Sequence, residues 1–289
     1  MLETRYEAPL TVQEAVTLLD TDAEARVLAG GTDLLVQLRT GRPAPSAFVD
    51  IKRIPEMGRL EINEEGLSCG AGVSAAEIFE NETIRSLWPG LAEATDLIGS
   101  TQIQGRATWS GNLCNASPAA DTVPALIALG AEVVIAGPSG ERTIAVEDFC
   151  TGPGQTVLAS GELVTRFCIA TPAARSADAY LRLIPRSEMD IAVVGSGVSL
   201  TLDADGTIVH ARVVLGAVAP TALRVEDAAN ALIGSRLDEA ALTAAAAAAS
   251  DAANPIDDKR GTVDYRKRVA GVLTKRAATI AYERAKERG

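Results

Sequence analysis

Two segments rich in glycine and other small residues constrain the fold of this chain more than any other feature. The first, AGGTDLL (29–35), lies between two short apolar runs. Glycines have no Cβ atom, so backbone N–H groups can approach a ligand closely there. Such a turn, when it leads into a helix N-terminus, can bind a diphosphate without Lys or Arg. Taken alone, Gly30 and Gly31 also fit an ordinary tight turn.

The second segment runs from Gly99 to Asp121 and contains many small and hydroxyl residues but few charges. A polar loop of this length inside a compact domain usually has a function. Within it, TWSGN (108–112) offers a second small-residue turn and an amide side chain. The sequence therefore predicts that the two segments clamp one dinucleotide from both sides, with the Asp121 carboxylate on ribose hydroxyls.

The two familiar nucleotide-binding fingerprints are absent. A dinucleotide loop of the Rossmann type needs three spaced glycines, whereas AGGTDLL has an adjacent pair. The P-loop pattern G-x-x-x-x-G-K-[ST] does not occur either. Neither a Rossmann dehydrogenase nor a P-loop NTPase follows from this sequence.

Local patterns predict the elements around the first segment. Thr11 with Glu14 has the spacing of a capping box, which predicts a helix over TVQEAVTLLD. A strand should end at the double glycine. A helix over DLLVQLRTG should follow, with Thr32 or Asp33 as its N-cap and Leu34, Leu35 and Leu38 on one face. SAFVDIKRI is the next expected strand.

From about residue 60 we expect a strand over GLSCGAGV, helices near 74–81 and 91–98, and a helix that starts at Asp121 or Thr122 and ends at Gly130. Beyond ATPAARSADAY the pattern changes to antiparallel strands, with the turn DADG, and then to helices. Strands followed by helices indicate an α+β lobe.

Composition excludes several classes of function. The net charge of −11 argues against a nucleic-acid partner, because phosphate binding depends on clustered Lys and Arg. No run of about 20 apolar residues predicts a membrane span, and the acidic N-terminus does not resemble a signal peptide. We therefore expect a cytoplasmic protein.

The four cysteines lack the close spacing of a zinc or iron–sulfur motif, and His210 is the single histidine. We expect no metal site and no catalytic acid–base residue in this chain. The cysteines are predicted to be reduced and mostly buried, and His210 is predicted to be a strand residue.

The motifs together resemble one known family. AGGTDLL, VDIKRIPEM, TWSGNLCNASPAADTVPALIALGAEVVI, GELV and RSEMDIAVVGSGV occur in the order found in the FAD-binding medium subunits of molybdenum hydroxylases, which include xanthine dehydrogenase and carbon monoxide dehydrogenase. The resemblance extends over essentially the whole chain.

The resemblance implies an α+β fold: an FAD-binding domain of the vanillyl-alcohol-oxidase (PCMH) type over residues 1–174, with lobes of about 1–56 and 57–174. A C-terminal domain of the CO-dehydrogenase flavoprotein type, with an antiparallel sheet and helices, would follow over 175–289. It also implies an electron-transfer role. Electrons would pass from two [2Fe-2S] clusters on a small subunit, through FAD on this chain, to an external acceptor. A large molybdopterin subunit would hydroxylate the substrate, in a dimer of heterotrimers.

By the same resemblance, residues 29–34 would surround the FAD pyrophosphate, and residues 108–112 would complete the binding site around it. Ile98 and Ile191 would flank the isoalloxazine. Val164 and Arg182 would make further flavin-side contacts. The implied set around FAD is Val27, Leu28, Ala29, Gly30, Gly31, Thr32, Asp33, Leu34, Ile98, Gly99, Thr108, Trp109, Ser110, Gly111, Asn112, Asp121, Val164, Arg182, Asp190 and Ile191.

The second segment departs from the family pattern T-I-G-G-N, because Trp109 and Ser110 replace Ile and Gly. The Ser110 hydroxyl is expected either to shift the local backbone path or to bond a phosphate itself. An alternative for Trp109 is that it packs in the lobe. Two other functions stay open. One is a self-contained flavin oxidoreductase of the same fold, such as a cell-wall precursor reductase. The other is a scaffold that has lost its cofactor.

Overall fold

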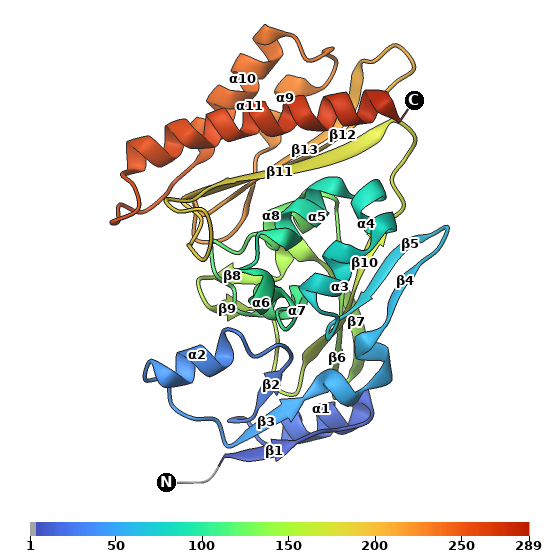
Figure 1. Ribbon diagram of the computed structural model, residues 1–289, viewed down its shortest axis with the longest axis vertical. Helices are drawn as coiled ribbons and strands as arrows, with labels where there is room; N and C mark the ends of the chain where they lie inside the picture. Colours follow the sequence, from blue (N-terminus) through green and yellow to red (C-terminus); the bar gives the residue numbers. More distant parts are fainter. Residues whose placement is uncertain (1–3, 289) are drawn as a thin grey trace.

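The computed structural model describes residues 4–288, which form three stacked layers (Figure 1). The N-terminal layer holds a parallel sheet of order β1-β3-β2, flanked by two helices. Three short 3-10 helices lie elsewhere in the first two layers. The bounds are β1 Arg5–Glu7, α1 Val12–Thr21, β2 Arg26–Leu28, α2 Leu34–Arg39, β3 Ala47–Asp50, η1 Ile51–Arg53, η2 Pro55–Gly58 and η3 Val146–Asp148.

The middle layer is an antiparallel sheet of order β4-β5-β10-β6-β7 with helices on one side and a small hairpin, β8-β9. The strands are β4 Leu60–Ile62, β5 Gly66–Gly70, β6 Glu132–Gly137, β7 Gly140–Ala145, β8 Cys150–Gly152, β9 Gln155–Thr156 and β10 Leu163–Ala170. The helices are α3 Ala75–Glu80, α4 Glu82–Leu87, α5 Pro89–Asp96, α6 Thr101–Gln104, α7 Trp109–Cys114 and α8 Thr122–Ala128.

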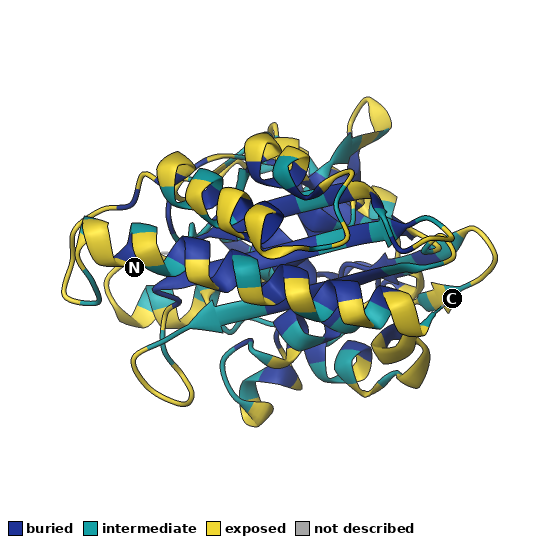
Figure 2. Cartoon of the chain, turned by 90° about the horizontal axis from the view of Figure 1, so that it is seen from above, coloured by how far each residue is buried: buried dark blue, intermediate teal, exposed yellow. Residues whose placement is uncertain are grey.

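The C-terminal layer is an antiparallel sheet of order β11-β12-β13-β14 covered on its outer side by three helices. The bounds are β11 Ser176–Leu183, β12 Val194–Leu202, β13 Ile208–Gly216, β14 Leu223–Arg224, α9 Glu226–Leu232, α10 Glu239–Ala252 and α11 Val263–Glu287. Helix α11 packs on β11 and β12, and α10 packs on α11. Seen from above, α11 alternates buried and exposed residues along its length, as expected for a helix that covers a sheet with one face (Figure 2).

Several local predictions are confirmed. The Thr11 hydroxyl accepts the N–H of Glu14 at 3.2 Å, and the Glu14 carboxylate accepts the N–H of Leu10 at 2.8 Å, so α1 begins where the capping pattern indicates. The predicted DADG turn joins β12 to β13. His210 is a strand residue of β13.

Other local predictions are wrong. The segment 99–121 is not a continuous loop, because α6 and α7 form within it. The strand predicted over SAFVDIKRI ends at Asp50 and continues as η1. Helix α2 has no buried residue, so its leucines form no core face, and Asp33 makes no side-chain cap.

The cysteines also differ from the prediction, since only Cys69 of the four is buried. All four are free thiols.

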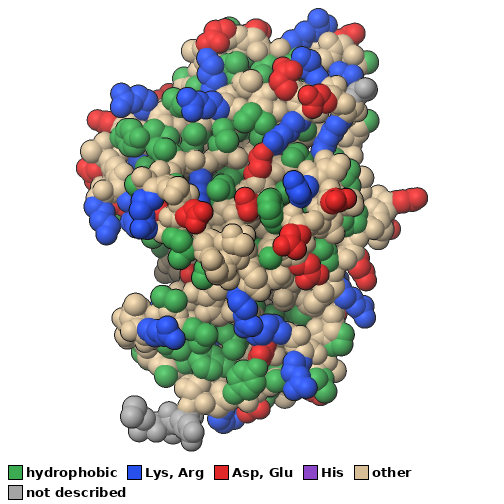
Figure 3. All heavy atoms as spheres, viewed as in Figure 1, with side chains coloured by type: hydrophobic (Ala, Val, Ile, Leu, Met, Phe, Trp, Pro, Cys, Tyr) green, Lys and Arg blue, Asp and Glu red, His purple; other side chains and the backbone are tan. Residues whose placement is uncertain are grey.

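Two large hydrophobic cores and one small cluster lie within residues 4–288. One extends through the first two layers and contains both tryptophans, Trp88 and Trp109, and the other lies between the C-terminal sheet and its helices. On the face seen in Figure 3, acidic and basic side chains are interspersed, and no basic stripe is present. Among residues 4–288, no helix combines the length and apolar character needed to cross a bilayer.

Candidate functional site

The two glycine segments meet in the fold. A Cβ atom placed on Gly30 would lie 1.9 Å from the carbonyl oxygen of Arg106, so the two backbones touch and leave no room for a side chain. Behind this contact, Gln37 of α2 donates from Nε2 to Oδ1 of Asn115 at 2.8 Å. Two segments that are far apart in sequence are therefore neighbours in space, and Gly30 is the point of closest approach.

The first segment is anchored by Lys52 of η1, which is in turn paired with Asp50 at the end of β3. The Lys52 ammonium donates to the carbonyl oxygen of Ala29 at 2.8 Å and to Oδ1 of Asp50 at 2.6 Å. The Tyr6 hydroxyl donates to the other oxygen of Asp50. Burial opposes the charged form of Asp50, but the hydrogen bonds from Lys52 and Tyr6 lower its pKa below the ordinary value. This carboxylate stays ionised and fixes the lysine that anchors Ala29.

Backbone donors in both segments are left without partners. Within residues 4–288, no hydrogen bond is made by the N–H groups of residues 30–33, and the same is true of the N–H groups of Trp109 and Ser110 at the start of α7. Gly31 has φ of +79°, a left-handed conformation that glycine adopts without strain. Consecutive free amides in such a turn form a concave donor surface suited to an anion.

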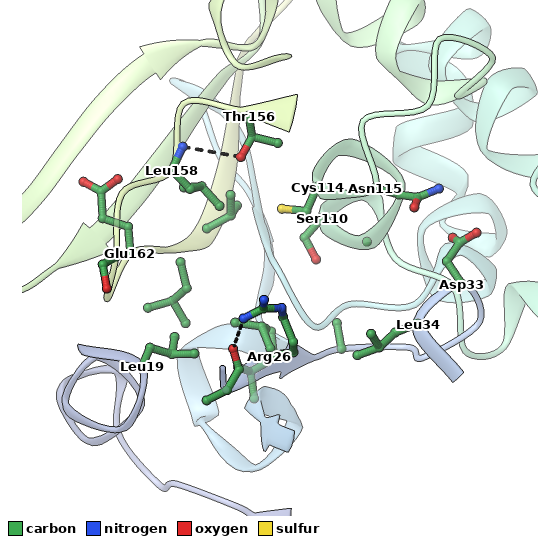
Figure 4. Close-up of a pocket in the computed structure, with 18 of the residues that line it drawn as sticks. Leu19, Arg26, Asp33, Leu34, Ser110, Cys114, Asn115, Thr156, Leu158 and Glu162 are labelled. Carbon is green, nitrogen blue, oxygen red and sulfur yellow. Dashed lines mark hydrogen bonds between the residues drawn. The ribbon is translucent and has the colours of Figure 1, made fainter. Parts of the chain in front are cut away.

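A cleft of about 480 Å³ opens beside these segments. Figure 4 shows residues from its three walls. Leu19, Arg26, Asp33 and Leu34 come from the N-terminal layer, Ser110, Cys114 and Asn115 come from α7 and its C-cap, and Thr156, Leu158 and Glu162 come from β9 and the segment before β10. This volume is in the range of small-molecule sites, and the lining combines aliphatic and polar groups. The cleft can hold a ligand that has both an apolar and a charged part.

Two arginines line the cleft and were not expected from the sequence. Arg26 donates from NH1 to the carbonyl oxygens of Ala23 and Ala25, both at 2.8 Å, and Arg42 donates from NH1 to Oε1 of Gln37 at 2.8 Å. Sequence reasoning assigned anion binding to backbone amides alone. The sequence did contain an indication of these cations, because both arginines flank the glycine motif.

Two carboxylates of the cleft differ in environment. Glu162 accepts two bonds from Arg142, at 2.8 and 2.7 Å, and these hydrogen bonds lower its pKa. The Asp33 carboxylate makes no side-chain hydrogen bond within residues 4–288, and burial raises its pKa. Asp33 is therefore the acidic group in this cleft that is free to accept hydroxyl donors.

Several predicted residues use their side chains elsewhere. The Trp109 ring is buried in the core, packs edge-on against Phe167 with centroids 5.7 Å apart, and donates from Nε1 to Thr95 at 2.9 Å. Thr108 caps α7 by accepting the N–H of Gly111 at 2.9 Å. Asn112 accepts from the Thr122 hydroxyl at 2.6 Å. A side-chain contact between Trp109 and a ligand in the cleft is excluded by this packing.

Asp121 and Arg182 lie together in a buried cluster rather than in the cleft wall. Oδ2 of Asp121 accepts from NH1 of Arg182 at 2.6 Å, and Oδ1 accepts from the Tyr180 hydroxyl at 3.0 Å. Burial raises the pKa of Asp121 to about 6, although Arg182 and Tyr180 act in the opposite direction. Asp121 occupies the N-cap position of α8, one of the two positions expected for the cap, but its side chain makes no capping hydrogen bond. Nε of Arg182 is buried without a partner within residues 4–288.

The remaining predicted residues are dispersed. Ile98 packs with Ala75 and Ala107, and Gly99 has φ of +58°. Asp190 accepts from Arg186 at 3.1 Å, and Ile191 lines a second cavity. The structure thus places the following predicted residues in the wall of one cleft: Val27, Ala29, Asp33, Leu34, Ser110, Gly111 and Val164. Leu28, Gly30, Gly31 and Thr32 belong to the same segment as four of them, without lining that cleft.

Comparison with known proteins gives two matching family models. Residues 2–172 match the FAD binding domain in molybdopterin dehydrogenase, and residues 179–281 match the CO dehydrogenase flavoprotein C-terminal domain. The chain is 35% identical over 282 residues to the carbon monoxide dehydrogenase medium chain of Hydrogenophaga pseudoflava, covering 96% of this chain and 97% of that one. It is 31% identical to the nicotinate dehydrogenase FAD-subunit of Eubacterium barkeri, with 95% of each covered.

Solved structures agree with these matches. The carbon monoxide dehydrogenase of Hydrogenophaga pseudoflava aligns with a TM-score of 0.93 at 34% identity, and 98% of each chain is covered. Quinoline 2-oxidoreductase from Pseudomonas putida 86 aligns with a TM-score of 0.91 at 30% identity, again over 98% of each chain.

Proposed function

This chain belongs to the family of FAD-binding subunits of molybdopterin-containing dehydrogenases, and from that premise we propose that it binds one FAD between its two glycine segments. Its task is to pass electrons from iron–sulfur clusters of a partner subunit to an external acceptor. When bound, FAD supplies the ability to exchange electrons singly or in pairs. The residues of this chain bind and orient it.

The unpartnered amides carry the proposal. The N–H groups of residues 30–33 face no acceptor in the described chain, and Trp109 and Ser110 add two more at a helix N-terminus. A diphosphate would satisfy such donors without requiring a buried cation. Gly30 is essential to this arrangement, because any Cβ atom there would separate the segments.

The cleft beside the amides suits the adenosine part of FAD. Arg26 and Arg42 would attract the phosphates, and the aliphatic walls would contact the adenine. Asp33 is a better ribose ligand than Asp121, since both oxygens of Asp121 already accept hydrogen bonds from Tyr180 and Arg182. We therefore assign the ribose contact to Asp33 and a positioning role to Asp121.

The partners follow from family membership and from the names of the relatives. We propose a large molybdopterin subunit, which hydroxylates the substrate, and a small subunit with two [2Fe-2S] clusters, assembled as a dimer of heterotrimers. Among residues 4–288 no group of three or more His, Cys, Asp or Glu is arranged as a metal site, so the metals would belong to those partners. The cytoplasmic location stays a prediction from the sequence.

The alternative of a self-contained flavin oxidoreductase would need an acid–base residue beside the flavin. Among the described residues that line the cleft, the Glu162 carboxylate is held by Arg142 and the Asp33 carboxylate is free. No observation favours this alternative or the scaffold without cofactor.

Co-purification from the native source, followed by molybdenum, iron and flavin analysis, tests the proposal. We expect one flavin and about four irons per set of three subunits, because two [2Fe-2S] clusters contain four irons. A flavin-containing chain that purifies alone would favour the self-contained enzyme. A preparation without flavin absorbance would refute the cleft assignment.

A further inference from the structure

Two cations contact the carbonyl side of the first glycine segment. The Lys52 ammonium donates to the carbonyl oxygen of Ala29 at 2.8 Å, and Nε of Arg106 donates to the carbonyl oxygen of Gly30 at 3.5 Å. Lys52 belongs to η1 and Arg106 follows α6, so two distant parts of the chain supply these cations. Both approach the cradle formed by the free N–H groups of residues 30–33 from behind.

One peptide unit connects each cation to a free amide. A trans peptide is planar, and its C=O and N–H bonds point in opposite directions. No peptide bond within residues 4–288 is cis. The carbonyl of Ala29 shares a peptide unit with the N–H of Gly30, and the carbonyl of Gly30 shares the next unit with the N–H of Gly31. Each cation therefore lies at the carbonyl end of a peptide unit whose N–H end has no partner within residues 4–288.

A cation at the carbonyl end makes the amide a stronger donor. Linked hydrogen bonds polarise one another, by about 10–30% per bond in condensed-phase estimates, because electron density shifts along the peptide dipole toward the oxygen. The N–H group at the other end becomes more positive. In addition, the cation attracts an anion bound to that N–H directly, since charges near a protein surface interact beyond contact distance.

Building on the proposed function, we propose that Lys52 and Arg106 are positioning residues for the diphosphate, and that they act on it through peptide units 29–30 and 30–31 without touching it. Close packing of the backbone explains why the charge is placed behind the cradle. A Cβ atom on Gly30 would lie 1.9 Å from the carbonyl oxygen of Arg106, so no side chain can extend from this position. The carbonyl side is where a cation can approach these units.

The charges around Lys52 determine how large its effect should be. Oδ1 of Asp50 lies 2.6 Å from the ammonium and compensates its charge, and Oδ2 accepts from the Tyr6 hydroxyl. The hydrogen bond to Asp50 raises the pKa of Tyr6, whereas the positive charges of Arg53 and Arg106 act in the opposite direction, so Arg106 lies near this group. Arg106 forms no ion pair within residues 4–288. A compensated cation at short distance and an uncompensated one at longer distance should contribute similarly.

The affinity for FAD tests the proposal, by fluorescence titration of the native complex after its flavin has been removed. Lys52→Met and Arg106→Gln each remove one cation, and each should weaken binding by about 3- to 30-fold. Lys52→Arg and Arg106→Lys keep the charge and should restore affinity to within about 3-fold of the wild type. Arg53→Gln is the matched control, because Arg53 is an exposed neighbour of Lys52, and it should change affinity by less than about 2-fold.

Asp50→Asn separates an electrostatic role from a structural one. Asparagine keeps an oxygen that can accept from Lys52 but removes the negative charge that compensates the ammonium. We expect FAD to bind about 2- to 5-fold more tightly, because the uncompensated cation attracts the diphosphate more strongly. A lysine that only anchors Ala29 would give no such gain.

Urea denaturation of the flavin-free samples shows which variants remain folded. If Lys52→Met is unfolded, Arg106→Gln and Asp50→Asn decide the outcome, since Arg106 is exposed and asparagine has nearly the shape of aspartate. Unchanged affinity in Arg106→Gln, or no gain in Asp50→Asn, overturns the action through the peptide units while FAD binding to the wild type stands. A wild type that binds no FAD refutes the proposed function itself.

Discussion

Replacing Gly30 by alanine should weaken flavin binding strongly and destabilise the fold moderately. The added Cβ atom would lie 1.9 Å from the carbonyl oxygen of Arg106, whereas ordinary contacts begin at about 3.4 Å. Both partners in this contact are backbone atoms, so neither can rotate away. The two segments must separate by about 1.5 Å, the difference between these distances.

A displacement of this size takes amides out of hydrogen-bonding range of a diphosphate. A hydrogen bond to a charged group contributes roughly 1.5–3 kcal/mol, so loss of two of them costs about 3–6 kcal/mol, or at least 100-fold in affinity. Crowding of the backbone should also destabilise the fold by roughly 1–3 kcal/mol, the usual range for overpacking. The two effects are separable, because one changes flavin content and the other changes the denaturation midpoint.

The assay is the ratio of flavin to protein after gel filtration, together with urea denaturation followed by circular dichroism. Gly58→Ala is the matched control, since a Cβ atom on this exposed glycine meets nothing within 4 Å. Retention of one flavin per chain in Gly30→Ala, with an unchanged midpoint, would show that the segments do not form the cradle.

Two further variants test other parts of the site, and a third tests the buried carboxylate of Asp178 in β11, which accepts the N–H of Leu91 at 2.9 Å. Trp109→Phe removes the bond to Thr95 and should cost about 1 kcal/mol in unfolding free energy while flavin content stays unchanged; loss of flavin at full stability would contradict the core placement of Trp109. Asp33→Asn should weaken flavin binding 3- to 30-fold in a fluorescence titration, since the amide is a weaker acceptor for ribose hydroxyls, whereas unaltered binding would return the ribose contact to Asp121. Burial raises the pKa of Asp178 to about 6 from 3.8, so the folded state binds more protons than the unfolded chain between these values. Its contribution to stability should therefore decrease by up to about 3 kcal/mol as pH rises from about 4 to about 6 and stay constant above, and Asp178→Asn should flatten that slope in urea titrations.

Local signals were sufficient to predict much of the architecture. The cap at Thr11, the turn before β13 and the long C-terminal helix are each specified by residues close in sequence. Helix α7 was missed because it is short and contains serine, glycine and asparagine, which are weak helix formers. It forms because Thr108 caps its first turn and because Trp109 is buried in the core. The burial of Trp109 depends on tertiary packing and not on residues close in sequence.

The electrostatics of the site were less accessible to sequence reasoning. Asp121 lies 61 positions before Arg182, and nothing in either local pattern indicates that they pair. The same limit applies to Lys52, which anchors Ala29 across 23 positions. The amino-acid pattern indicated which backbone could bind an anion. The charged group that holds this backbone, Lys52 of η1, is distant in sequence and is brought to Ala29 only by the tertiary fold.

The Ser110 hydroxyl shows how a proposed anion site made of backbone amides can include a residue that has a side chain. In the family pattern this position is a glycine, so a serine should either disturb the path or contact the phosphate. Instead its Oγ atom donates to the carbonyl oxygen of Ala71 at 2.6 Å and lies 3.0 Å from the Thr108 hydroxyl. Both partners belong to the body of the middle layer, so the hydroxyl ties the start of α7 to the end of β5.

This arrangement leaves the Ser110 N–H free, as the proposed anion site requires, and it attaches the N-terminus of α7 to the chain at Ala71. Ser110→Gly should therefore keep its flavin but lose about 1 kcal/mol of stability, from the lost hydrogen bond and the greater freedom of the unfolded chain. Ser110→Ala separates these two contributions, because it removes only the hydrogen bond. If Ser110→Gly instead lost flavin at unchanged stability, the hydroxyl would be a phosphate ligand, and its bond to Ala71 would not survive cofactor binding.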